Sequence, residues 1–204
     1  MQTVCHLALL PHEQAKKYGD RTVFEYKDFG GTVWRKVSWN EFSESVMKVS
    51  NALLNLGVKA QENIGVFSQN ALQYFYTDFG AFGVRAVTIP FYATSSEQQL
   101  QYVINDAQIR LFFVGEQEQY DKARRVQALC STLERIVIYD ASVTLAEHDV
   151  TSIYFNDFMK QGEGLPRQTE VERLWNELND DDIANILYTS GTTGESKGVV
   201  LTCG

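Results

Sequence analysis

The chain has 204 residues, of which 44% are hydrophobic and 22% are charged, and this composition is typical of a folded globular domain. Its net charge of −8 argues against a nucleic-acid partner, because binding to a phosphate backbone requires clustered lysines and arginines. The cysteines lack the spacing of metal ligands or of a disulfide framework, which favours a reducing compartment.

Neither a membrane-spanning segment nor a signal peptide is evident. No apolar run approaches the roughly 18 residues that a spanning helix needs, and the first residues lack the basic and apolar regions of a signal peptide. We therefore expect a cytoplasmic protein. Peripheral contact with the inner face of a membrane and assembly into a homo-oligomer are both left open by the sequence.

The amino-terminal part predicts a helix, a β-hairpin and a second helix. Residues 11–18 are expected to be helical, and strand-like runs follow at residues 22–26 and 32–37, with paired glycines between them that suit a hairpin. Ser38 and Glu41 have the spacing of a capping box, so a helix is expected to begin there. Its apolar residues recur at helical steps and predict one buried face: Phe42, Val46, Val49, Leu53 and Leu56.

Strand-like and helical segments alternate through the middle of the chain. The strands are expected at residues 63–67, 85–90, 110–114 and 135–140. The helices are expected at residues 70–82, 96–106 and 117–130. Strands that are regularly separated by helices form parallel sheets with both faces covered. The predicted fold class is therefore α/β, with a doubly wound, mainly parallel sheet flanked by helices and with an amino-terminal β-hairpin.

Residues 141–179 are more polar and less periodic than the rest. We interpret them as a variable connector with short helices at residues 154–159 and 169–178. The aspartates at residues 180–182 are interpreted as solvated residues at the entry to the next strand, with metal binding as the alternative. That strand is expected at residues 183–189, and ligand-binding loops follow the carboxyl ends of strands in open α/β sheets. A functional loop is therefore expected directly after it.

The segment Tyr-Thr-Ser-Gly-Thr-Thr-Gly-Glu-Ser-Lys-Gly at residues 188–198 combines glycines, hydroxyl side chains and one lysine between two strand-like runs. Glycines let backbone N–H groups converge on an anion, hydroxyls add donors, and Lys197 adds a point charge suited to phosphate. The segment differs from the P-loop of NTPases, because no hydroxyl residue follows Lys197 and the flank resembles a strand. We therefore predict a loop that binds the phosphates of a nucleotide; a surface hairpin without a ligand is the alternative.

This segment resembles the phosphate-binding signature of the adenylate-forming superfamily, which includes acyl-CoA synthetases, firefly-type luciferases and the adenylation domains of peptide synthetases. The family pattern Tyr-Thr-Ser-Gly-Thr-Thr-Gly-x-Pro-Lys-Gly-Val matches residues 188–199, except that Ser196 stands in place of proline. The loss of proline frees φ and is expected to loosen the loop. Residues 83–96 are similar to the Val-Pro-x-Tyr-x-Thr-Ser-Ser pattern of the long-chain fatty acid branch, and residues 18–42 resemble the opening of acyl-CoA synthetases.

The resemblance implies that residues 1–204 form the amino-terminal part of the AMP-binding large domain, and that the carboxy-terminal domain of such enzymes is absent from this chain. It implies ATP-dependent activation of a fatty acid, with a long-chain acid favoured, to an acyl-adenylate and then to acyl-CoA. ATP, Mg²⁺ and coenzyme A are the implied cofactors and co-substrates. No catalytic residue is assigned within the chain, since the adenylation lysine is expected beyond Gly204, and the chain alone is expected to be inactive.

The resemblance assigns ATP binding to the loop, through Thr189, Ser190, Gly191, Thr192, Thr193, Gly194 and Lys197. Thr192 is the candidate for contact with Mg²⁺. Cys203 stands where relatives often carry a histidine, and a thiol with an ordinary pKa of about 8.5 is a poor substitute donor. Two other functions are left open: a different adenylating ligase, such as a peptide-synthetase domain or an acyl-carrier-protein ligase, and a non-catalytic nucleotide-binding module.

Two further segments have structural interpretations. Ser95 or Ser96 is expected to cap the helix at residues 96–106 rather than to bind a ligand. An aromatic stripe on the preceding helix is expected to pack in the core rather than to line an acyl tunnel; it consists of Tyr74, Phe75, Tyr76, Phe79 and Phe82.

Overall fold

The computed structural model of the chain describes residues 6–163, 168–190 and 196–203. Its helices are the 3-10 turn η1 (Leu7–Leu9), α1 (Leu10–Tyr18), α2 (Trp39–Asn55), α3 (Leu72–Gly83), α4 (Glu97–Asp106), α5 (Gln117–Gln127), α6 (Phe155–Lys160) and α7 (Gln168–Trp175). Its strands are β1 (Thr22–Tyr26), β2 (Arg35–Ser38), β3 (Asn63–Phe67), β4 (Val87–Phe91), β5 (Leu111–Val114), β6 (Arg135–Ile138), β7 (Ser152–Tyr154), β8 (Ile183–Ser190) and β9 (Ser196–Thr202).

Within the described residues, one 7-stranded sheet has the order β7-β6-β5-β3-β4-β8-β9, and β1 and β2 form a separate antiparallel hairpin. Neighbours in the large sheet are parallel except β8 and β9, which are antiparallel. β3 lies between β4 and β5, so the chain crosses back over β3 on its way from β4 to β5. The predicted fold class, a doubly wound and mainly parallel α/β sheet with an amino-terminal hairpin, is confirmed.

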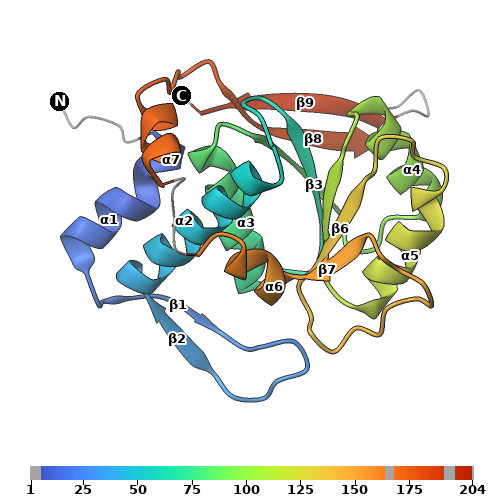
Figure 1. Ribbon diagram of the computed structural model, residues 1–204, viewed down its shortest axis with the longest axis horizontal. Helices are drawn as coiled ribbons and strands as arrows, with labels where there is room; N and C mark the ends of the chain where they lie inside the picture. The colour runs from blue at the N-terminus through green and yellow to red at the C-terminus, as the bar shows by residue number, and fades with distance from the viewer. Residues whose placement is uncertain (1–5, 164–167, 191–195, 204) are drawn as a thin grey trace.

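Helices cover both faces of this sheet (Figure 1). Helices α2, α3, α6 and α7 contribute buried side chains to the core on one face. Helices α4 and α5 contribute to the core on the opposite face. Because both faces are covered, β3, β5 and β6 are buried almost throughout and do not alternate between apolar and polar residues.

Two helices begin where capping boxes place them. Ser38 Oγ accepts a hydrogen bond from the backbone N–H of Glu41 at 3.2 Å, and Glu41 Oε2 accepts one from the N–H of Ser38 at 2.8 Å. Ser96 and Gln99 form the same reciprocal pair at the start of α4. Each box satisfies N–H groups that a helix terminus otherwise leaves unpaired. The interpretation of Ser96 as a cap is therefore confirmed.

Part of the polar region at residues 141–179 folds onto the sheet. Ser152–Tyr154 forms β7, a parallel strand beside β6 that the sequence did not predict. Phe155 and Phe158 of the following α6 are buried in the core. A strand this short has too few residues to show a period, so its position depends on pairing with β6 rather than on local pattern.

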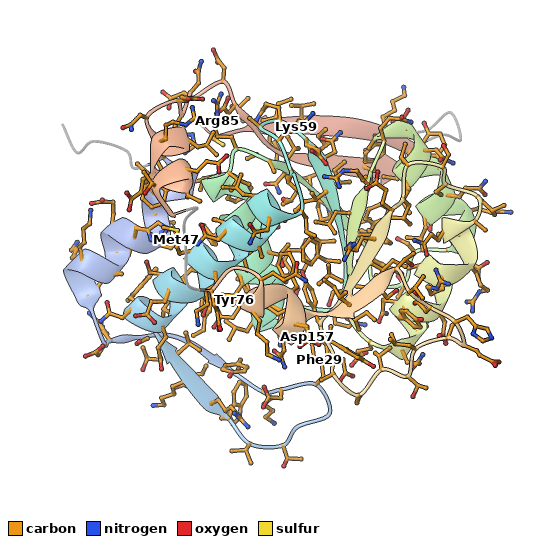
Figure 2. All side chains as sticks on the ribbon, viewed as in Figure 1. Phe29, Met47, Lys59, Tyr76, Arg85 and Asp157 are labelled. Atoms are coloured by element: carbon orange, nitrogen blue, oxygen red, sulfur yellow. The ribbon has the colours of Figure 1, made fainter. Side chains whose placement is uncertain are left out.

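Asp182 is buried, so the interpretation of the aspartates at residues 180–182 as solvated is wrong at this position. Its carboxylate accepts two hydrogen bonds from Arg85, one from Nε at 2.8 Å and one from Nη2 at 2.9 Å. Arg85 precedes β4 and Asp182 precedes β8, so the ion pair joins the amino ends of two neighbouring strands. Figure 2 shows Arg85 beside the segment that leads into β8. Asp180 and Asp181 are exposed, as predicted.

The described residues contain no group of three or more His, Cys, Asp or Glu side chains that could hold a metal ion. The buried aspartate before β8 is instead neutralised by an arginine. None of the helices in the described ranges combines the length and the apolar character needed to cross a bilayer.

Helices α2 and α3 approach closely at Gly80, where a side chain has no room. A Cβ atom there would lie 2.3 Å from Cγ1 of Val49 and 3.3 Å from the backbone nitrogen of Ser50. We expect Gly80→Ala to lower the free energy of unfolding by about 2 kcal/mol, although alanine has the better helix propensity. The extra methyl group would force the closely packed atoms of α2 to shift. Denaturant unfolding measures this loss.

The double variant Gly80→Ala/Val49→Ala provides the control. Removal of the valine methyl groups relieves the contact with Cγ1, although Cβ of residue 49 stays 2.6 Å from the new Cβ, so the second substitution should cost somewhat less in the alanine background than in the wild type. Strictly additive losses would contradict a direct clash between these two positions.

Candidate functional site

The carboxyl ends of the central strands open onto a cavity of about 430 Å³. The helix after β3, α3, packs on one face of the sheet, whereas the helix after β4, α4, packs on the other, so the two connections diverge here. Open α/β sheets bind ligands at such points. The lining comes from residues 68–70 after β3, residues 90–93 at the end of β4, Tyr74 of α3, and residues 187–189 near the end of β8.

The β8–β9 hairpin places the two described ends of the predicted loop side by side, and the β8 end lines this cavity. In the ladder Thr189 pairs with Lys197 and Tyr188 pairs with Gly198. Directly opposite residues of an antiparallel pair project to the same face. Lys197 therefore shares the face of Thr189, which lines the cavity, and Lys197 is exposed. Thr189 therefore lines the cavity, and Lys197 lies opposite it on the neighbouring strand.

The other loop candidates are not brought together by the described residues. The backbone of Ser190 pairs with Ser196 at the base of the loop. Gly191, Thr192, Thr193 and Gly194 lie outside the described residues. Their roles in phosphate binding, and that of Thr192 toward Mg²⁺, stay predictions.

The lining residues at positions 68–70 were not singled out from the sequence. Residues 68–70 are a polar run directly after the apolar strand β3, and this change of polarity is the signal that could have placed them at a strand end. Tyr92 is 75% exposed beside them. Tyr74 lies deeper, and burial, followed by the nearby charge of Asp78, raises the pKa of its hydroxyl. That hydroxyl therefore stays protonated and is available as a donor.

The aromatic stripe of α3 packs in the core along most of its length. Tyr76 stacks on Phe42 with ring centroids 5.6 Å apart, and Phe79 meets Phe82 edge to face at 5.8 Å. The core interpretation is therefore confirmed for Tyr76, Phe79 and Phe82. Tyr74 instead faces the cavity, and Phe75 is 40% exposed.

Asp78 lies one helical turn along α3 from Tyr74. Its Oδ1 atom is buried and has no hydrogen-bond partner among the described residues. Burial raises the pKa of the carboxyl to about 7, although a hydrogen bond with Thr88 acts in the opposite direction. The carboxyl group is therefore expected to change its protonation near neutral pH.

We expect Asp78→Asn to change how stability depends on pH. The ordinary pKa of this carboxyl is 3.8 and the folded chain raises it to about 7, so between these values the folded state holds one proton more than the unfolded state. Stability should then fall as the pH rises through this window, by at most about 1.4 kcal/mol per pH unit. Denaturant unfolding across the window should show this downward contribution in the wild type and not in the variant.

The control for this prediction is Asp181→Asn, because Asp181 is exposed. It should keep the wild-type dependence on pH. Identical pH profiles for the wild type and Asp78→Asn would contradict a buried, protonated carboxyl at this position.

Cys203 lies at the end of β9 that is remote from the loop. Its N–H donates to the backbone carbonyl of Asp182 at 2.8 Å, and its side chain packs beside Phe82 and Ala184. Burial, followed by the charges of Asp182 and Asp180, raises the pKa of the thiol to about 11. The thiol is therefore neutral, as expected, and it does not line the cavity at the loop.

The fold and the cavity define a doubly wound α/β protein with its candidate site at the carboxyl ends of the strands. The sequence profile of the family described as AMP-binding enzyme matches residues 11–204. The chain therefore belongs to the AMP-binding enzyme family.

Curated relatives are acyl-CoA ligases. The chain is 28% identical over 191 residues to long-chain-fatty-acid–CoA ligase ACSBG2 of Homo sapiens, with 93% of this chain and 28% of the relative covered. It is 31% identical over 177 residues to fatty acyl-CoA synthetase A of Dictyostelium discoideum, with 80% and 25% covered. The chain spans only about a quarter of the length of these relatives.

Solved structures share the fold. The anthranilate CoA ligase AuaEII in complex with anthranoyl-AMP aligns with a TM-score of 0.79 at 19% identity, over 100% of this chain and 36% of that chain. The A domain of carboxylic acid reductase from Segniliparus rugosus, solved with AMP and a co-purified carboxylic acid, aligns with a TM-score of 0.77 at 20% identity, over 99% and 36%. At these identities the likeness establishes the fold.

Proposed function

We propose that this chain is part of an ATP-dependent ligase that activates a fatty acid, of long chain, to an acyl-adenylate and then to acyl-CoA. The observation that carries the proposal is the pairing of Lys197 with Thr189, a residue that lines the cavity. Both belong to a segment that matches the family's phosphate-binding pattern at every specified position except Ser196. Relatives named long-chain-fatty-acid–CoA ligases support the choice of acid.

In this proposal the loop binds the β- and γ-phosphates of ATP. The Thr189 hydroxyl donates a hydrogen bond, the Lys197 ammonium offsets the negative charge, and the amides of the glycine-rich segment complete the site. Mg²⁺ would accompany the triphosphate, with Thr192 as a contact. Because the described residues hold no cluster of acidic ligands, we assign the ion mainly to the phosphate oxygens of ATP.

The proposed reaction has two displacement steps. A carboxylate oxygen of the fatty acid attacks the α-phosphorus, the bond to the bridging oxygen breaks, and pyrophosphate leaves with that electron pair. The thiolate of coenzyme A then attacks the acyl carbon, and AMP leaves with the electrons of the broken C–O bond. The role of this chain is to hold the departing pyrophosphate in line and to stabilise its charge.

Exchange of labelled pyrophosphate into ATP tests the proposal, because the first step is reversible. The longest polypeptide that the gene encodes should catalyse exchange only when an acid is present, and a long-chain fatty acid should support it better than an amino acid. Exchange that depends on amino acids would instead assign a peptide-synthetase type of ligase. ATP binding without exchange with any acid would favour a non-catalytic nucleotide-binding module. Because the 204 residues cover only about a quarter of the length of the curated relatives, we expect them to give no exchange by themselves.

A further inference from the structure

Helix α4 contacts both strands that carry the loop. The hydroxyl of Tyr102 donates to the backbone carbonyl of Ser196, the first residue of β9, at 3.1 Å. The hydroxyl of Tyr188, near the carboxyl end of β8, donates to Oδ2 of Asp106 at 2.5 Å. Figure 1 shows α4 beside these ends of β8 and β9. One rigid helix therefore holds the strand that enters the loop and the strand that leaves it.

We propose that Tyr102 and Asp106 are positioning residues that fix the two ends of the phosphate loop relative to each other. The inference rests on the proposed function. Neither residue lines the cavity beside Thr189, so each acts through a strand rather than on a ligand. A fixed separation of the two ends keeps the loop amides and Lys197 pre-organised for the phosphates.

The contact at Ser196 restrains the backbone at a position where the family pattern has proline. Proline at this position fixes φ through its ring, whereas serine leaves φ free. In this chain the carbonyl of Ser196 is held by Tyr102, and its backbone pairs with Ser190. From the sequence, serine in place of proline is expected to loosen the loop. We expect this loosening only when the Tyr102 hydroxyl is removed.

The surroundings of Tyr188 support a dedicated contact. A Cβ atom at Gly198 would lie 3.6 Å from Cζ of Tyr188, an ordinary van der Waals distance, so the Tyr188 ring lies directly beside the backbone of Gly198. A second cavity, of about 200 Å³, separates part of α4 from the base of the loop, and its lining includes Gln99 of α4 and Tyr188. Because side chains do not fill this space, the hydrogen bonds of Tyr102 and Tyr188 contribute more to the distance between α4 and the two strands.

The variants Tyr102→Phe and Asp106→Ala test the proposal in the longest polypeptide that the gene encodes. We expect each to raise the KM for ATP about fivefold, the effect of one lost hydrogen bond, with the KM for the fatty acid unchanged. Asp106→Asn keeps an acceptor oxygen and should restore the KM for ATP. Hydrogen exchange of peptides covering residues 186–190 and 196–202 should be faster in both damaging variants than in the wild type.

The matched control is Tyr154→Phe, which removes a hydroxyl that donates to the carbonyl of Val143 at 2.7 Å, away from the loop. This variant should leave unchanged both the KM for ATP and the rate of hydrogen exchange in β8 and β9. Hydrogen exchange that is unchanged from the wild type in Tyr102→Phe and Asp106→Ala would overturn the proposal. Faster hydrogen exchange with an unchanged KM for ATP would also overturn it. If the wild type adenylates no acid, the proposed function fails, while hydrogen exchange still decides whether α4 holds the loop ends.

Discussion

Lys197→Ala is expected to raise the KM for ATP by about 10- to 100-fold in the longest polypeptide that the gene encodes. Lys197 pairs with Thr189, which lines the cavity, and in the proposed function its ammonium group offsets the charge of the triphosphate. A charge-assisted contact of this kind is worth about 1.4 to 2.8 kcal/mol, which corresponds to that range. Steady-state pyrophosphate exchange at varied ATP concentration measures the change.

Two further variants sharpen this result. Lys197→Arg keeps the charge but not the compact geometry of the ammonium, so an intermediate KM is expected. Lys59→Ala removes an exposed lysine at the turn before β3, at the opposite end of that strand from the cavity (Figure 2), and should leave the KM unchanged. Equal effects of Lys197→Ala and Lys59→Ala would show a general influence of net charge and would contradict a local phosphate contact.

Asp182→Ala is expected to lower the free energy of unfolding by about 3 kcal/mol. The side chains of Arg85 and Asp182 are only 18% and 9% exposed, so removal of the carboxylate leaves a largely buried guanidinium without its two-bond partner. Glu177, 3.4 Å from Arg85 and 44% exposed, compensates only in part. Denaturant unfolding of the chain measures the loss.

The pH dependence and two controls test the assignment to this pair. The hydrogen bond from Arg85 lowers the pKa of Asp182, so its stabilisation is present above the ordinary aspartate pKa of 3.8 and is lost as the pH falls through the lowered value. The difference in free energy of unfolding between the wild type and Asp182→Ala should therefore become smaller at acid pH. Asp181→Ala should change stability by less than about 0.5 kcal/mol. In an Arg85→Gln background Asp182→Ala should cost less, and an undiminished cost would refute the pairing.

The features that the sequence by itself determined are those encoded over a few residues. The strand at residues 63–67 and the capping box at Ser38 are found where the sequence places them, and Ser96 is the one of two candidate serines that caps α4. The strand depends on a short continuous apolar run, and each cap depends on a hydrogen bond between residues three apart. The loop signature at residues 188–199 is local in the same sense, and the family it indicates is confirmed by the profile match.

Only the tertiary structure decided which distant segments meet. Asp182 is buried where it binds Arg85, 97 positions away. β7 forms through parallel pairing with β6. Ser196 is held by Tyr102, 94 positions away, and Tyr74 with residues 68–70 completes the cavity at the loop. No local pattern predicts such partners, since the order of strands in the sheet brings them together. Spacing along the chain therefore determined the elements and the loop, and the packing of the whole sheet decided what surrounds them.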